Sequence, residues 1–198
     1  MKFLSLCGRA LAFLLLMSLL TGGLYTLAVT GIAKAVFPYQ AGGSIFEAHG
    51  RQYAELLGQS FSDPRHLWGR IFTPDTNTFK DKDGRPLLYA WPSNLSPAGK
   101  DYAELVRERV ERLRAAHPEK AGVPVPVDLV TGSGSGLDPH ISVAAAYYQI
   151  PRLVRNTGLT EQQVKGIIDR HTQGRQLGVF GEPRVNVLKV NLTLDGLL

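Results

Sequence analysis

The sequence predicts an α+β fold, in which a single N-terminal transmembrane helix is followed by one mixed α+β extramembrane domain. Two observations lead to this expectation. Residues 10–33 form a run of twenty-four residues without a charge. After that run, helix caps alternate with turn signals and short apolar segments, a mixture typical of an α+β domain. About 160 residues remain for this domain, which is enough to bury one core.

The uncharged run is long enough to span a bilayer. At about 1.5 Å per residue it forms a helix of roughly 36 Å, against a hydrocarbon core of about 30 Å. A cleaved signal peptide is the alternative, but its apolar core is about 7–15 residues and ends in small residues. Residues 28–30 (AVT) match such a cleavage site poorly, and Cys7 lacks the surroundings of a lipoprotein site. We therefore expect a retained, single-pass anchor.

Charges beside the span set its expected orientation. Lys2 and Arg9 precede it and Lys34 follows it, so the positive-inside rule slightly favours a cytoplasmic N-terminus. The expected organisation is a cytoplasmic segment 1–9, a transmembrane helix 10–33, a juxtamembrane connector 34–50 and a periplasmic domain 51–198. The expected location is the cell inner or plasma membrane. In the connector, Pro38 and the glycine pair 42–43 break any continued helix.

Composition excludes several classes of function. The net charge is +5, and three of these charges flank the span, so the domain carries only about +2. No dense basic run with interleaved aromatic residues exists, which argues against nucleic acid as a partner. The only cysteine, Cys7, excludes an intramolecular disulfide and a cysteine zinc site.

The domain's first elements follow from turn and capping signals. Asp83-Gly84 predicts a hairpin turn between residues 78–79 and 87–89. Residues 96–97 (SP) open an amphipathic helix that ends at residues 117–118 (HP), with Glu108 and Arg112 as an i,i+4 pair on its solvated face. Residues 123–130 (VPVPVDLV) read as an edge strand.

Three helices and a strand are expected in the C-terminal part. Asp138-Pro139 predicts the start of a helix that runs to about Gln149, and Pro151 restarts a helix that ends near Gly158. Residues 160–163 (TEQQ) form a capping-box pattern that opens a third helix. Residues 184–194 read as a strand, whose apolar phase switches at residues 187–188 and so indicates a bulge or a change of buried face.

The segment 131–140 (TGSGSGLDPH) is the most conspicuous place for chemistry. Backbone N–H groups of such a loop can hold an anion or a nucleotide phosphate. The candidate residues for that role are Gly132, Ser133, Gly134, Ser135 and Gly136. No phosphate-loop motif is present, and a tight turn with Asp138 as the helix cap is the favoured interpretation.

Catalytic and metal sites lack support in the sequence. Ser133, Ser135, Asp138 and His140 supply the residue types of a hydrolase, but no nucleophile elbow exists. The histidines show no zinc-ligand spacing, and Asp81 with Asp83 forms only half a calcium loop. We therefore predict no catalytic residue, no metal and no cofactor of its own. Glu182 and Arg184 lie at a turn, available to a partner, and Trp68 and Trp91 are apolar anchors of a core or an interface.

Short motifs along nearly the whole chain match a known family. The two most specific are residues 132–142 (GSGSGLDPHIS) and 181–188 (GEPRVNVL). Further matches, in family order, are residues 37–38, 40–41, 43–44, 58–59, 61, 93–97, 149, 152, 175, 178 and 191–192. The chain resembles the C subunit of the bacterial high-affinity potassium-transporting ATPase, the Kdp complex. It departs from the usual family pattern at residues 69–72 (GRIF) and in the stretch that follows to Trp91.

The resemblance implies a membrane subunit without catalytic chemistry. Its partners would be a channel-like potassium-translocating subunit and a P-type ATP-hydrolysing subunit, in contact with membrane lipid. Two roles follow for it: coupling and assembly at the periplasmic side, or a chaperone-like part that raises the ATP affinity of the hydrolysing subunit, with ATP reached through the complex. The glycine-rich loop is expected in the periplasm, where ATP is scarce, and this location argues for the role in coupling and assembly. Asp138, His140, Glu182 and Arg184 are then candidate interface residues, as members of matching motifs.

Overall fold

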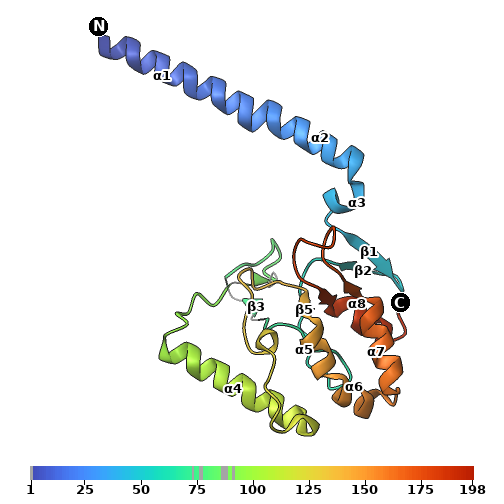
Figure 1. Ribbon diagram of the computed structural model, residues 1–198. Coiled ribbons are helices and arrows are strands. Elements are labelled where there is room, and N and C mark those ends of the chain that lie inside the picture. Colours follow the sequence, from blue (N-terminus) through green and yellow to red (C-terminus); the bar gives the residue numbers. More distant parts are fainter. Residues whose placement is uncertain (1, 73, 76–77, 86–88, 91) are drawn as a thin grey trace. The chain divides into compact units, whose positions relative to one another are not determined.

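The computed structural model describes residues 2–72, 74–75, 78–85, 89–90 and 92–198. The chain divides into two compact units, Met1–Phe46 and Glu47–Leu198. Both helices and strands are present, with one long apolar helix at the N-terminus and a mixed domain after it (Figure 1). The predicted α+β class is therefore confirmed.

The first unit contains one apolar helix made of three consecutive segments. They are α1 (Lys2–Ser18), the π-helix η1 (Leu19–Tyr25) and α2 (Thr26–Val36). The helix Phe3–Val36 contains an eighteen-residue window with a mean hydropathy of 2.1, and it is long and apolar enough to cross a membrane. In the π-helical segment the Thr26 hydroxyl donates to the Thr21 carbonyl, five residues back, at 3.0 Å. The uncharged residues 10–33 lie wholly inside this helix.

The apolar helix ends at Val36, just before the predicted breaker Pro38 and three residues beyond the expected span 10–33. Phe37 leaves helical geometry (φ −130°, ψ 57°), because the residue before a proline disfavours the α conformation. The short helix α3 (Pro38–Ala41) follows, and Gly43 adopts a positive φ of 91°. Pro38 and the glycine pair thus interrupt the helix, as expected.

The described residues of the second unit combine short strands with five α-helices. Strands β1 (Ile45–Ala48), whose first two residues belong to the first unit, and β2 (Arg51–Ala54) form one two-stranded sheet. Strands β3 (Pro74–Asp75) and β4 (Tyr89–Ala90) pair antiparallel, with Pro74 opposite Ala90. The third sheet has the order β5 (His140–Ser142), β7 (Arg184–Asn186), β6 (Thr172–Gln173), with β7 antiparallel to both neighbours.

Helices α5 (Val143–Tyr148), α6 (Ile150–Thr157), α7 (Glu161–Arg170) and α8 (Val187–Leu194) gather around the third sheet (Figure 1). Their inward side chains form the core with Leu113 of α4 (Lys100–Ala116) and Leu67 of a loop. The predicted end of α6 and the predicted capping box of α7 are confirmed. Gly158 ends α6 in the left-handed conformation (φ 74°), and Thr160 and Gln163 form the capping box of α7.

Two expected elements begin or form differently. Helix α4 starts at Lys100 rather than Pro97, because residues 96–99 close a turn in which the Gly99 N–H donates to the Ser96 carbonyl at 2.8 Å. It ends at Ala116, as predicted. Residues 123–130 are not a strand: prolines at 124 and 126 remove ladder donors, and η3 (Val127–Leu129) is a 3-10 turn.

The helix expected from Asp138 starts later. Residues 140–142 are in β5, paired with β7, so α5 begins only at Val143. Its N-cap is Ser142, whose hydroxyl accepts from the Ala145 N–H at 3.2 Å. Asp138 caps the preceding turn instead, accepting from the His140 N–H at 3.0 Å.

The prediction of one strand over residues 184–194 is wrong for its second half. Strand β7 covers only Arg184–Asn186, and α8 follows at once. The Asn186 side chain accepts from the Lys189 N–H at 3.0 Å and so starts this helix. The switch of apolar phase at residues 187–188 therefore marks a change from strand to helix, not a bulge.

The turn at Asp83-Gly84 is present. The Asp81 carboxylate accepts from the N–H groups of Asp83 and Arg85 at 2.9 and 2.8 Å, and Gly84 has a positive φ of 77°. Strands β3 and β4 pair on either side of it. Residues 87–88 and Trp91 of the sequence interpretation lie outside the described residues.

Candidate functional site

The glycine-rich loop is closed by its own hydrogen bonds. The Ser133 hydroxyl accepts from the Asp138 N–H at 3.4 Å, and the Ser135 hydroxyl accepts from the Leu137 N–H at 3.1 Å. The Gly136 N–H donates to the Ser133 carbonyl at 3.2 Å. The cavity beside the loop measures about 10 Å³, scarcely room for one water molecule. The role of residues 132–136 in anion binding stays a prediction.

A neighbouring segment presses on this loop. The Gly58 N–H donates to the Leu137 carbonyl at 2.7 Å. A Cβ at Gly58 would lie 2.9 Å from the Asp138 carbonyl oxygen, so only glycine fits there. The close approach explains why a glycine is required at a position far from the loop in sequence, and it holds Asp138 in place.

Asp138 and His140 lie together, but they form no catalytic triad with the serines. His140 Nδ1 is 3.6 Å from the Asp138 carboxylate, and Arg70 reaches the same carboxylate at 3.9 Å. Ser133 and Ser135 pair with each other at 3.3 Å, and within the described part of the chain neither bonds His140. Burial lowers the pKa of His140, and the Asp138 carboxylate opposes this shift. Burial therefore favours the neutral form of His140.

Glu182 and Arg184 lie at the base of an exposed hairpin. Glu182 is 77% exposed and pairs with Arg175 at 2.7 Å across the hairpin. Arg184 is exposed on β7, opposite Ser142 of β5. Both residues are thus exposed to solvent, Glu182 in the hairpin and Arg184 at the start of strand β7. Interface contacts by either residue remain predicted.

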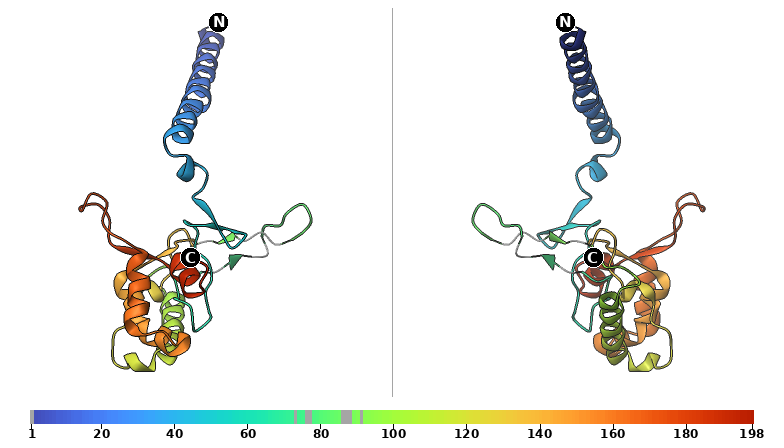
Figure 2. Two further views of the ribbon diagram at one scale, coloured as in Figure 1. Left: turned by 90° about the vertical axis from the view of Figure 1, so that its right-hand side faces the viewer. Right: turned by 90° about the vertical axis from the view of Figure 1, so that its left-hand side faces the viewer.

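Sequence reasoning missed the hairpin's tip, residues 175–181. Leu177, Val179 and Phe180 are 84%, 70% and 63% exposed. Two hydrogen bonds between Gln176 and Phe180, at 2.8 and 2.9 Å, hold the tip in one conformation. Leu177 has a positive φ of 53°, which a residue with a Cβ rarely adopts. The red-brown hairpin projects away from the helices of its unit (Figure 2).

The signal for this tip was present but weak. Three apolar residues stand between Gly174 and Gly181, a pattern that reads equally well as a short strand. Exposure alone distinguishes the two cases. Ordered, strained and apolar tips cost free energy in an isolated chain and so mark a surface that contacts something else.

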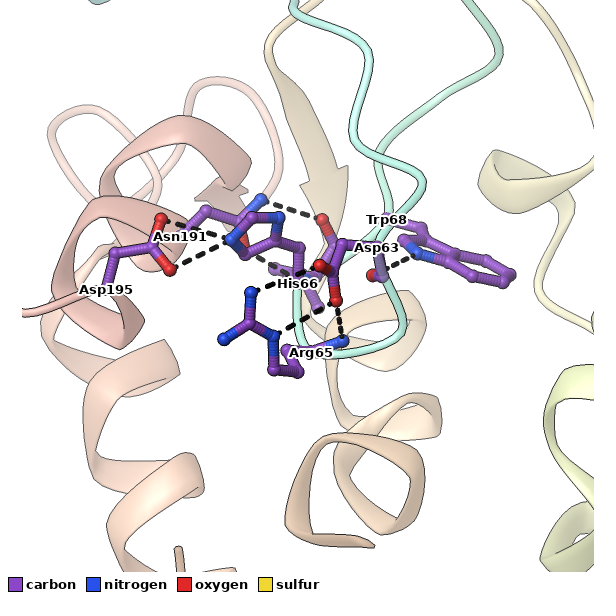
Figure 3. Close-up of polar contacts among 7 residues, drawn as sticks. Asp63, Arg65, His66, Trp68, Asn191 and Asp195 are labelled. Atoms are coloured by element: carbon purple, nitrogen blue, oxygen red, sulfur yellow. Dashed lines mark hydrogen bonds and ion pairs between the residues drawn. The ribbon is translucent and has the colours of Figure 1, made fainter. Parts of the chain in front are cut away.

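Loop 63–68 is clamped to α8 by polar side chains (Figure 3). The Asn191 side chain accepts from the Leu67 N–H at 2.6 Å and donates to the Leu67 carbonyl at 2.9 Å. His66 Nε2 meets both Asp195 carboxylate oxygens at 3.0 Å, and the Trp68 indole donates to the Asp63 carbonyl at 2.9 Å. The clamp fixes Trp68 and the residues that follow it.

A buried arginine holds the same loop from the other side. Arg152, 1% exposed, donates to the His66 carbonyl at 2.9 Å and to the Pro64 carbonyl. It also donates to Gln149 at 2.7 Å and to His117 Nε2 at 3.0 Å, and its guanidinium lies 4.1 Å from the Trp68 ring centroid. Burial lowers the pKa of Arg152 to about 10 and that of His117 to about 4.

Metal ligands do not gather anywhere in the part of the chain that the structure describes: no group of three His, Cys, Asp or Glu side chains could hold an ion. The polar clusters described above are each closed by internal partners. Among the described residues of the second unit, the apolar tip and a groove beside α4 are open to solvent.

Comparison with known proteins settles the family. The family model described as KdpC, the K⁺-transporting ATPase c chain, matches residues 7–196. The chain belongs to this family. Potassium-transporting ATPase KdpC subunits of Clostridium botulinum (strain Alaska E43 / Type E3) and Clostridium perfringens are both 52% identical to it. The first match covers 100% of this chain and 98% of the relative, and the second covers 96% of each.

A more distant organism gives the same result. The KdpC subunit of Sorangium cellulosum is 51% identical over 192 residues, which cover 94% of this chain and 95% of the relative. The resemblance inferred from the motifs 132–142 and 181–188 is therefore confirmed. As a family member, the chain is an accessory subunit of a potassium-transporting ATPase complex.

Proposed function

We propose that the chain assembles and couples the subunits of the potassium pump and carries no active site of its own. Its partners in this proposal are the potassium-translocating and the ATP-hydrolysing subunits. The observation that supports it best is the ordered apolar tip of Leu177, Val179 and Phe180. Docking of these side chains into an apolar cleft of a partner would remove them from water, at about 1.5–3 kcal/mol for each large side chain.

The charges around the tip favour a protein partner. Arg175 is already paired with Glu182, so the tip offers apolar side chains without a net charge. Lipid-binding loops usually add cations that meet anionic headgroups. The closed hydrogen bonding of the glycine-rich loop likewise supports coupling over direct contact with ATP.

The test is a double variant, Leu177→Ser with Phe180→Ser, expressed with the whole complex. We expect at least tenfold weaker retention of the chain by the other subunits, and a matching loss of potassium-stimulated ATPase activity. The matched control is Val127→Ser, because Val127 is 65% exposed on η3 and away from the tip. Wild-type retention and activity of the tip variant would refute the docking role.

Orientation is the second part of the proposal: a cytoplasmic N-terminus and a periplasmic second unit. The test is a cysteine at the exposed Ser135 in a Cys7→Ser background, treated in cells with a membrane-impermeant thiol reagent. Labelling of intact cells is the expected result. Protection that persists without the partner subunits would reverse the orientation and favour the ATP-affinity role.

A further inference from the structure

A groove between α4 and loop 60–72 gathers three arginines. Arg70, Arg109 and Arg112 line one cavity of about 130 Å³, together with the hydroxyl residues Ser60 and Ser62. This volume holds several water molecules and hence a four-oxygen anion. No carboxylate lines the cavity among the described residues.

The positions of the arginines follow from the fold. Arg109 and Arg112 are one helical turn apart on α4, so their side chains share a face. Arg70 comes from the loop that Asn191 and Arg152 clamp in place. Two chain segments distant in sequence therefore contribute the three arginines to the wall of one cavity.

These guanidinium groups keep unused donors. Arg70 bonds Thr131 and the Gly132 carbonyl at 3.3 and 3.0 Å, but its Nε is buried without a partner. Arg109 donates to the Val130 carbonyl at 3.2 Å. Ion pairs among the described residues do not include the expected Glu108–Arg112 pair. Arg112 lies over the Trp68 ring instead, 5.4 Å from its centroid.

Charge compensation inside the chain is weak. Among the described residues, the acidic group in ion-pair distance of these arginines is Asp138, 3.9 Å from Arg70 and bonded to the His140 N–H as well. Glu108 acts on Arg109 electrostatically, yet burial lowers the pKa of Arg109. Three cations in a recess repel each other, and a multiply charged anion relieves that repulsion.

We propose that this cavity binds a phosphate group through Arg70, Arg109 and Arg112. The planar guanidinium fork matches phosphate oxygens in pairs, and Ser60 and Ser62 add hydroxyl donors. A dianion balances the three charges better than a single carboxylate does. The phosphate group belongs either to a phospholipid headgroup or to a free phosphate compound.

The test titrates inorganic phosphate into the full chain in detergent by calorimetry at low salt. We expect saturable one-to-one binding, weakened at least tenfold in Arg109→Gln and in Arg112→Gln. The matched control is Arg107→Gln, because Arg107 is exposed on the same helix and lies outside the cavity. It should change the affinity by less than twofold.

Three results would overturn the proposal: no saturable binding, equal weakening in Arg107→Gln, or acetate bound as tightly as phosphate. The last would make the cavity a carboxylate site. Urea midpoints of the variants show whether they fold, and Arg112→Gln is the safest of them because Arg112 is exposed.

A second arm distinguishes the source of the phosphate. The chain is placed in nanodiscs of phosphatidylglycerol or of a neutral, phosphate-free glycolipid, and phosphate is titrated again. If wild-type protein binds phosphate more weakly in phosphatidylglycerol discs than in neutral discs, and Arg112→Gln removes this difference between the discs, the site is assigned to a lipid headgroup. Equal binding in both kinds of disc assigns it to a free phosphate. Either result upholds the site.

Discussion

Replacing Arg152 by methionine should destabilise the second unit by about 3 kcal/mol. The side chain is 1% exposed and donates to four acceptors: Pro64 O, His66 O, Gln149 Oε1 and His117 Nε2. Gln149 keeps a second donor in the Trp68 N–H, so three acceptors lose their partner. At about 1–2 kcal/mol for each, the loss is about 3–6 kcal/mol.

Two further effects of this change offset each other in part. Removal of the buried charge relieves its desolvation, which is large enough to lower the pKa of Arg152 to about 10. The stacking on Trp68, at 4.1 Å, is lost. The net value near 3 kcal/mol is therefore the expected change in the free energy of unfolding.

The assay is urea unfolding of the full chain in detergent, followed by tryptophan fluorescence, because Trp68 contacts Arg152 directly. The matched control is Arg155→Met, one turn along α6. Arg155 is 44% exposed, pairs with Glu119 and donates to the Ala116 carbonyl at 3.0 Å. Such an exposed pair contributes about 1 kcal/mol or less. If Arg152→Met lowers the free energy of unfolding by an amount within about 1 kcal/mol of that for Arg155→Met, the reasoning is refuted.

Two other changes test the same core. Asn191→Leu leaves the buried Leu67 N–H and carbonyl unpaired, so the free energy of unfolding should fall by about 2–4 kcal/mol in the same urea assay. The control is Asn156→Leu, which should lower it less, because Asn156 is part-buried and makes one bond, to the Arg152 carbonyl. The pKa of His117 falls from 6.5 to about 4 in the folded chain, so the unfolded chain binds more protons between these values and stability declines as the pH falls. The expected loss from this group is about 2 kcal/mol between pH 7 and pH 5; an unchanged acid limb in His117→Asn would contradict this account.

Local signals predicted the elements that local chemistry controls. The end of the long helix at Pro38, the αL cap at Gly158 and the capping box at 160–163 depend on residues within a few positions. The start of α5 does not. It moved from Asp138 to Val143 because residues 140–142 pair with β7, some forty residues away. The same pairing ends β7 at Asn186, where α8 begins.

The candidate sites show the same division. The motifs 132–142 and 181–188 carried the family resemblance without any knowledge of contacts. They did not reveal the apolar tip at Leu177–Phe180, because its residues read equally well as a strand until their exposure is known. Arg70, Arg109 and Arg112 stand in unremarkable sequence surroundings and meet only through the fold.

The sequence by itself determined the apolar helix, the family and the positions of the capped helices, because hydropathy, motifs and caps are properties of neighbouring residues. Only the tertiary structure decided where strand changes to helix at Asn186, which loops Arg152 and Asn191 hold, and which arginines share a cavity. These features depend on hydrogen bonds and packing between segments distant in sequence, such as Leu67 and Asn191, 124 residues apart, and such pairings leave no periodic signal in the chain.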